Sequence, residues 1–340
     1  MATAIHNFQF VVRLSMSNGI RRICRRAYST RKLTNAEVRR KRVELFDAEK
    51  QRQLALVTRV EKIEVRHKGV PEECTLIMNK DLSTPFNCAM HIHELLMNRS
   101  ALALVNGEPW DMHRPLERDC ELRFLHFQDE DSRVLNNAFW RTCAFILGHV
   151  LETAFKDEYY VELCSFPPPN VSSGSFVYDA ALNIGDWQLS QTELNCLSRI
   201  GYRLSYADLK IQRLEVPVSV ADQMFADNRF KQEQVSAIAA KSKSGATVTL
   251  YRAGDHVDLS SGPMIGSTAQ IGRYSVCAVH DIESPTFGKL QRVQGLALPT
   301  QLTMHSWTYD TILRPRAAKL NTGPLPEMRK TQTPKELPAP

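Results

Sequence analysis

The sequence predicts an α+β protein in which a small β-grasp domain precedes a larger α+β domain. Residues 60–128 follow the order strand, strand, helix, strand, strand, which suits a β-grasp fold. Residues 129–316 begin with a long helical pattern of apolar residues and continue with further helices and short strands. A chain of 340 residues with 43% hydrophobic residues can bury cores in both domains.

The amino-terminal segment, residues 1–28, predicts a mitochondrial presequence. The first 36 residues contain arginines and a lysine but no acidic residue before Glu37, and apolar residues alternate with the cations. Arg26-Ala27-Tyr28-Ser29 resembles the pattern cleaved by the matrix protease, so we expect processing near Tyr28 and a location in the mitochondrial matrix. A basic disordered tail is the alternative. No apolar run is long enough to span a bilayer.

Residues 29–59 predict a basic helical extension. Thr34 and Glu37 form a capping-box pattern at its start. Four consecutive cations follow: Arg39, Arg40, Lys41 and Arg42. Their mutual repulsion must be relieved by nearby acidic residues or by an external polyanion such as a phosphate backbone. A solvated charged face remains the alternative interpretation.

The β-grasp prediction for residues 60–128 rests on turn and cap signals. Residues 63–66 and 75–78 alternate as strands on either side of a Lys-Gly-Val-Pro turn, and Ser83-Thr84-Pro85 predicts the start of a helix. The blocks at residues 83–92, 105–111 and 115–119 resemble a TGS domain. This ubiquitin-like module lies at the front of threonyl-tRNA synthetases.

The larger domain contains a motif whose chemistry is incomplete. Residues 251–259 read as an extended strand that enters a Ser-Ser-Gly-Pro turn, which presents Ser260 and Met264. Arg141 and Phe145 lie four residues apart on the long helix. Arginine has too high a pKa to act as a general base, phenylalanine can only fill volume, and an unactivated serine is a weak nucleophile.

These positions resemble the editing site of threonyl-tRNA synthetases, where the motifs are Asp-Leu-Cys-x-Gly-Pro-His and His-x-x-x-His. The resemblance implies the editing-domain fold without the activity, because Arg141, Phe145, Ser260 and Met264 replace the four reactive residues. His149 lies one turn beyond Phe145, but nothing in the sequence identifies a partner that could orient it. We therefore expect no catalytic residue, no cofactor and no metal site.

The resemblance covers residues 60 to 315 and stops before any aminoacylation core. A proline-rich tail, residues 317–340, follows. We expect the cations outside the folded domains to contact RNA, namely Arg39, Arg40, Lys41, Arg42, Arg314, Arg316, Arg329 and Lys330.

The whole architecture is similar to a family of mitochondrial ribosomal proteins of the large subunit. This similarity implies a structural role in contact with large-subunit mitochondrial rRNA and neighbouring mitoribosomal proteins. Two alternatives stay open: a mitochondrial deacylase that edits mischarged tRNA, and a regulatory subunit of a synthetase.

Overall fold

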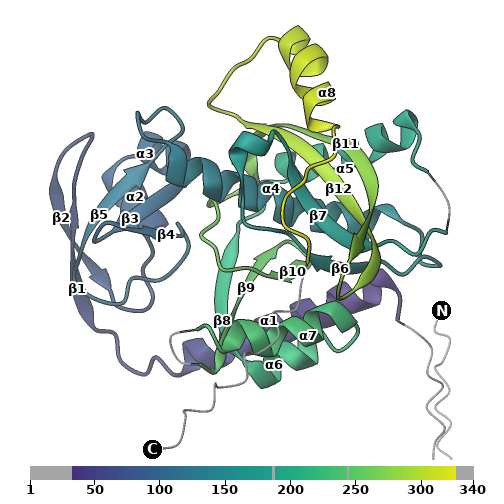
Figure 1. Cartoon of the computed structure of the whole chain (residues 1–340). Helices are drawn as coiled ribbons and strands as arrows, with labels where there is room; N and C mark the ends of the chain where they lie inside the picture. Colours follow the sequence, from purple (N-terminus) through teal and green to yellow (C-terminus); the bar gives the residue numbers. More distant parts are fainter. Residues whose placement is uncertain (1–32, 186–187, 243–244, 327–340) are drawn as a thin grey trace, which may run out of the picture. The chain divides into compact units, whose positions relative to one another are not determined.

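The computed structural model describes residues 33–185, 188–242 and 245–326 (Figure 1). The expected presequence and the tail cations Arg329 and Lys330 lie outside these residues. The helices are α1 (Asn35–Ala55), α2 (Pro85–Ile92), α3 (Glu94–Arg99), α4 (Arg133–Ala154), α5 (Gln191–Tyr206), α6 (Val218–Met224), α7 (Arg229–Ala239) and α8 (Arg314–Ala317), with short helical turns η1 (Val171–Ser173), η2 (Thr268–Gln270) and η3 (Thr308–Leu313). None of the helices in the described ranges has the length and apolar character needed to cross a membrane.

Residues 62–125 form the predicted β-grasp domain. Its strands are β1 (Lys62–His67), β2 (Cys74–Asn79), β3 (Leu102–Val105), β4 (Glu108–Trp110) and β5 (Cys120–Leu125). They form one sheet in the order β2-β1-β5-β3-β4, in which β1 and β5 are parallel. Thr84 caps α2 through a capping box and Pro85 occupies the first turn, as the sequence predicts. Val65, Cys88 and Leu122 are buried between the sheet and α2.

A three-stranded antiparallel sheet carries the Ser-Ser-Gly-Pro loop. Its strands are β8 (Gln212–Pro217), β9 (Thr247–Ala253) and β10 (His256–Leu259), in the order β10-β9-β8. The prediction of one strand over residues 251–259 is wrong, because the chain reverses between β9 and β10. Gly254 has a φ of 61°, a left-handed conformation that glycine adopts without the steric cost of a Cβ atom. The turn therefore places Asp255 at its tip.

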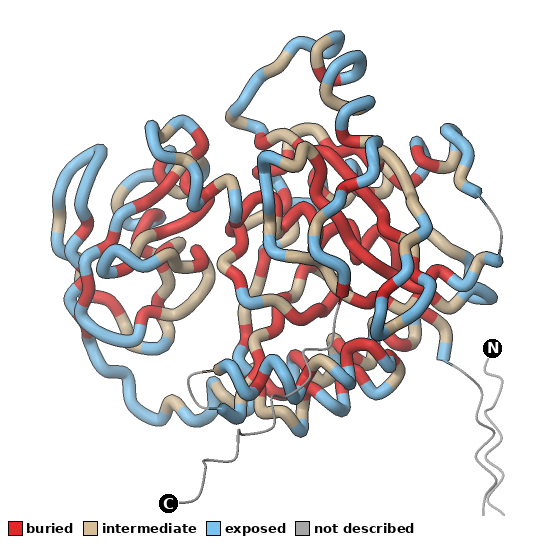
Figure 2. The backbone as a smooth tube through the Cα atoms, viewed as in Figure 1, coloured by how far each residue is buried: buried red, intermediate tan, exposed pale blue. Residues whose placement is uncertain are grey.

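A four-stranded antiparallel sheet forms the largest core. Its strands are β6 (Glu162–Ser165), β7 (Phe176–Ala181), β11 (Ile271–Ser284) and β12 (Gly288–Pro299), in the order β11-β12-β7-β6. Helices α4 and α5 pack against this sheet, and the buried residues gather between them (Figure 2). A Cβ atom at Gly201 of α5 would lie 2.4 Å from Cδ1 of Tyr274, so glycine allows the close approach of α5 to β11.

Helix α1 is part of the larger domain and not a separate extension. The predicted capping box of Thr34 and Glu37 is present. The helix packs against α4, α6, β8 and β10, and Phe46 is fully buried in the apolar cluster beneath the three-stranded sheet. Residues 29–59 therefore do not form an independent unit over the part that the structure describes.

The first residues of the proline-rich tail are also bound to the larger domain. Arg292 of β12 is 1% exposed and donates hydrogen bonds to the carbonyl oxygens of Asn321, Gly323 and Pro324 at 2.8–2.9 Å. The same guanidinium forms two 2.8 Å hydrogen bonds with the carboxylate of Asp179. These bonds, and one from Ser284 to the carbonyl oxygen of Pro326, attach the described part of the predicted tail to the larger domain.

Candidate functional site

The two halves of the incomplete motif meet where α4 faces the loop after β10. The guanidinium of Arg141 donates to the carbonyl oxygen of Pro263 at 3.0 Å, and the hydroxyl of Thr142 accepts from the amide of Ile265 at 3.0 Å. These contacts join residues more than 120 positions apart in the sequence. Burial lowers the pKa of Arg141 from its usual value, yet arginine remains a cation near neutral pH.

Arg141 and Ser260 line one cavity of about 440 Å³ between α4, α7 and the loop. The described residues around it are Ser165, Phe166, Pro167, Pro168, Lys231, Gln234, Ile238, Lys241, Ser242, Thr247, Thr249, Leu259 and Ser261. Aspartate, glutamate, histidine and cysteine are absent from this set. The Ser260 hydroxyl oxygen accepts from the amide of Gly262 at 3.3 Å. The described lining residues therefore include no histidine or carboxylate that could act as a base for Ser260.

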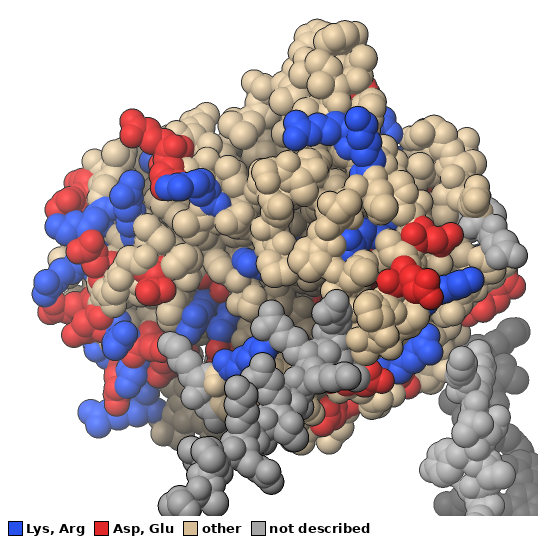
Figure 3. Space-filling model, viewed as in Figure 1, with Lys and Arg blue, Asp and Glu red and all other residues tan. Residues whose placement is uncertain are grey.

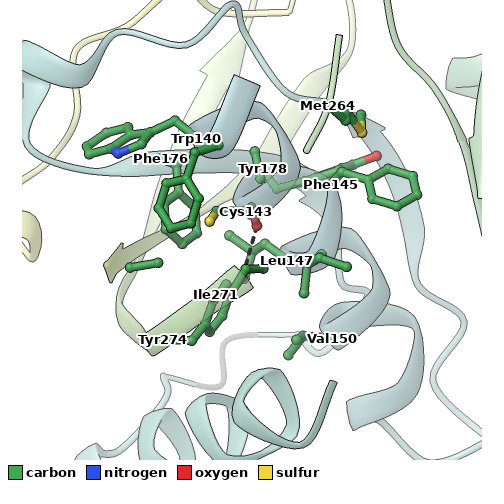
Figure 4. Close-up of a cluster of buried hydrophobic side chains, with 14 of the residues drawn as sticks. Trp140, Cys143, Phe145, Leu147, Val150, Phe176, Tyr178, Met264, Ile271 and Tyr274 are labelled. Atoms are coloured by element: carbon green, nitrogen blue, oxygen red, sulfur yellow. Dashed lines mark hydrogen bonds between the residues drawn. The ribbon is translucent and has the colours of Figure 1, made fainter. Parts of the chain in front are cut away.

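The other two substituted positions lie in the core. Phe145 and Met264 each have a relative exposure of 0% and belong to the same apolar cluster (Figure 4). Both side chains therefore occupy volume within the core. A thioether and a phenyl ring in a closed core can neither bind nor activate water.

Three polar groups next to the cavity were not identified from the sequence. Asp258 of β10 accepts from the ammonium of Lys231 at 2.6 Å and from the hydroxyl of Tyr178, and all three side chains are buried. Burial and the neighbouring carboxylate raise the pKa of Tyr178 well above its ordinary value, so the phenol remains a proton donor. Lys231 gave no sequence signal, because Arg-Phe-Lys-Gln-Glu-Gln reads as a solvated helix.

The expectation that His149 has no orienting partner is wrong. Its Nε2 lies 2.7 Å from Oδ1 of Asp255, and its ring stacks on His256 with the centroids 5.3 Å apart. Nδ1 of His256 in turn lies 2.7 Å from the carboxylate of Glu152. Burial, opposed by the bond to Asp255, lowers the pKa of His149. Neither histidine is among the described residues that line the cavity, so this pair is structural.

The basic run of α1 supplies cations to this buried pair. Arg42 is 2% exposed, and its Nη1 lies 2.6 Å from a carboxylate oxygen of Glu152. Arg39 lies 2.9 Å from Asp255. Burial alone would raise the pKa of Glu152, but Arg42 and His256 together lower it to about 2. The expectation that Arg42 contacts RNA is wrong, because its side chain is enclosed by protein.

The remaining predicted RNA contacts differ in exposure. Lys41 forms an ion pair with Asp227 at 2.5 Å, whereas Arg40 is exposed and lies 3.8 Å from Glu44. Arg314 is half-buried and pairs with Asp310 at 3.3 Å, and Arg316 is exposed. Figure 3 shows basic side chains near α8 that lie mostly apart from acidic ones, whereas the two signs are mixed over the β-grasp domain.

Comparison with known proteins agrees with this geometry. The TGS domain family matches residues 70–126. The chain is 44% identical over 299 residues to large ribosomal subunit protein mL39 of Drosophila melanogaster. This alignment covers 86% of this chain and 89% of that protein. It is also 32% identical over 228 residues to human cytoplasmic threonine–tRNA ligase 2, and 34% identical over 230 residues to the mitochondrial threonine–tRNA ligase of Rattus norvegicus.

The extent of these matches separates the two kinds of relative. The alignments to the two ligases cover 66% of this chain but only 26% and 30% of the ligases themselves. The alignment to the ribosomal protein covers more than four fifths of both chains. From its fold and this similarity over 86% of its length, the chain belongs to the family of large ribosomal subunit protein mL39.

Proposed function

We propose that this chain is a structural constituent of the mitochondrial large ribosomal subunit and catalyses no reaction. The observation that carries the proposal is the 44% identity to a large-subunit ribosomal protein over 89% of that protein's length. In this role the two folded domains act as a body that fixes neighbouring components by surface contact. The location would be the mitochondrial matrix, where that particle works.

The chemistry of the cavity supports the absence of catalysis. Hydrolysis of an aminoacyl ester near neutral pH needs a general base within hydrogen-bond reach of the attacking group. Ser260 receives a hydrogen bond from a backbone amide, and Lys231 is held in an ion pair with Asp258. The editing-deacylase alternative therefore has no described group that could activate water or serine in this cavity.

The partners would be large-subunit rRNA and adjacent mitoribosomal proteins. Exposed cations gain most from contact with phosphate, because binding releases counterions from the RNA. Arg40 and Arg316 are the exposed candidates among the described residues, and Arg329 and Lys330 extend the set. Three cations no longer belong to this set, because each pairs with a carboxylate of the same domain: Arg39 with Asp255, Lys41 with Asp227 and Arg42 with Glu152.

Sedimentation of a mitochondrial lysate in a sucrose gradient tests the proposal. We expect the protein to migrate with the large subunit in an amount equal to that of its other proteins. A regulatory subunit of a synthetase would instead migrate with the much smaller ligase. Recovery of the protein only in the light fractions, with the large subunit intact, would reject the ribosomal role.

A further inference from the structure

The outer face of α5 carries exposed aromatic and cationic side chains. We define the α5 outer face as Arg199, Tyr202, Arg203 and Tyr206. These residues are spaced three and four positions apart, so they lie on one side of the helix. The opposite side, with Leu194, Leu197, Gly201 and Ser205, is the buried side that packs on β11.

The two tyrosines expose their rings to solvent. Tyr202 is 47% exposed and Tyr206 is 77% exposed, with ring centroids 5.0 Å apart and a tilt of 50° between the rings. Buried tyrosines of this domain, such as Tyr178 and Tyr274, are enclosed and hydrogen-bonded. Exposed neighbouring rings of this kind offer flat π-surfaces on which planar groups can stack.

The two arginines of the α5 outer face are unpaired within the described residues. Arg199 and Arg203 are exposed, and neither forms an ion pair there, unlike Arg133, which is also exposed but lies 3.0 Å from Asp131. Residues 194–207 contain no acidic side chain at all. Two guanidinium groups thus remain available to an external anion.

A groove extends this surface. Tyr202 and Tyr206 line it together with Arg273, Leu302 and Met304, and its volume is about 500 Å³. The described residues of its wall include a cation and no carboxylate. Arg273 lies over the ring of Tyr309, with its guanidinium carbon 5.2 Å from the centroid, and donates to the hydroxyl of Ser306 at 3.1 Å. These contacts hold the charge in place at the wall of the groove.

We propose that the α5 outer face and this groove bind unpaired nucleotides of RNA, an inference that rests on the ribosomal role proposed above. Bases that are not paired can leave the helical stack and pack against aromatic rings, while the arginines neutralise the adjoining phosphates. A regular RNA duplex fits less well, because its bases are already stacked and only its backbone is accessible. An acidic protein segment would satisfy the arginines but would leave the tyrosine faces without planar partners.

The experiment measures binding of the purified protein to a fluorescein-labelled single-stranded RNA of about ten nucleotides by fluorescence anisotropy. Tyr202→Ala with Tyr206→Ala should weaken binding roughly tenfold or more through lost stacking. Tyr202→Phe with Tyr206→Phe should retain most of the affinity, because the ring faces remain. Arg199→Ala with Arg203→Ala should reduce the slope of log K against log salt by about 1.4, at about 0.7 per phosphate contact.

The matched control replaces an exposed tyrosine and a paired arginine elsewhere on the surface, Tyr159→Ala with Arg133→Ala. Thermal melts verify that all variants are folded. The proposal is overturned if the α5 variants bind the RNA as tightly as this control. It is also overturned if a duplex of the same sequence, or poly-glutamate, binds the wild type more tightly than the single strand.

Sedimentation separates failure of this inference from failure of the proposed function. If the wild-type protein migrates with the large subunit and the α5 variants keep full RNA affinity, only the proposal for the α5 outer face is rejected. If the wild-type protein is absent from the large subunit, the ribosomal role is rejected, and the reason to choose RNA as the partner is lost with it.

Discussion

Individual side chains at the four substituted positions either fill the core or line the cavity. Phe145 and Met264 are fully buried at positions where the related editing motifs have histidine, and Arg141 donates to a backbone carbonyl of the loop it faces. Each residue now contributes packing or a hydrogen bond in place of chemistry. Their loss should therefore change stability.

Phe145→Ala should lower the free energy of unfolding by roughly 3–5 kcal/mol, because it removes a buried ring and leaves a cavity in a packed core. Urea denaturation followed by circular dichroism gives this value. Val134→Ala, on the same helix but 40% exposed, is the control and should change stability by less than about 0.5 kcal/mol. Equal effects of the two substitutions would show that Phe145 does not act through burial.

Glu152 should make the protein sensitive to acid. Its pKa is about 2 in the folded state, below roughly 4.3 for an unfolded chain. A lowered carboxyl pKa stabilises the fold above the unfolded value, and this contribution is lost as pH falls towards the folded value. Between pH 7 and pH 3 the group should account for roughly 2 kcal/mol of lost stability.

Denaturant titrations at these two pH values measure the effect. Glu152→Gln should lower stability at pH 7, since Arg42 loses its buried counter-ion, but should flatten the dependence on pH. Glu44→Gln, at an exposed pair with Arg40, should leave the pH dependence as in the wild type. A Glu152→Gln curve parallel to that of the wild type would contradict the assignment.

At the scale of elements, Arg292 holds the tail together with Gln294 and Ser284, which donate to the carbonyl oxygens of Ala317, Lys319 and Pro326. Arg292 donates to the Asp179 carboxylate and to three backbone carbonyls of residues 321–324. Lysine has a single nitrogen and cannot reproduce this planar arrangement. The attachment of residues 321–324 should therefore weaken when Arg292 is replaced by lysine.

Limited proteolysis with mass spectrometry tests this prediction. Arg292→Lys should speed cleavage near Leu320, which is 50% exposed, and should lower stability, by up to 3–5 kcal/mol if Asp179 is left without a partner. Arg133→Lys, at a surface pair, serves as the control. Unchanged cleavage of the tail in Arg292→Lys would mean that the bonds from Gln294 and Ser284 hold it without the guanidinium.

Local sequence signals predicted where helices begin, whereas ion pairs between residues far apart in the sequence could not be predicted. The caps at Thr34 and Thr84 depend on residues three positions apart, so the sequence shows them directly. The partner of Arg42 lies 110 residues away, and nothing local indicates that this arginine is buried. The four substituted positions could be grouped only through a resemblance to known motifs, because α4 and the loop after β10 are distant in sequence.

At the scale of the whole molecule, the β-grasp domain closes the cleft loop of the larger domain. The carboxylate of Asp111 accepts from the amide of Met264 at 2.8 Å and from the hydroxyl of Tyr251 at 3.0 Å. A Cβ atom at Gly262 would lie 1.9 Å from the same hydroxyl, so the loop allows no larger residue there. The loop that carries Ser260 is thus contacted by side chains of both domains.

The purified protein should not hydrolyse Ser-tRNA or Thr-tRNA, because the described lining of the cavity offers no group suited to act as a base near neutral pH. Ser260→Cys alone should also remain inactive, since a thiol without an adjacent histidine or other activating group has little thiolate at pH 7. Release of labelled amino acid from each aminoacyl-tRNA is the measurement, with spontaneous hydrolysis in buffer as the reference. Wild-type activity that disappears in Ser260→Ala would refute the inert-scaffold interpretation and restore the editing enzyme.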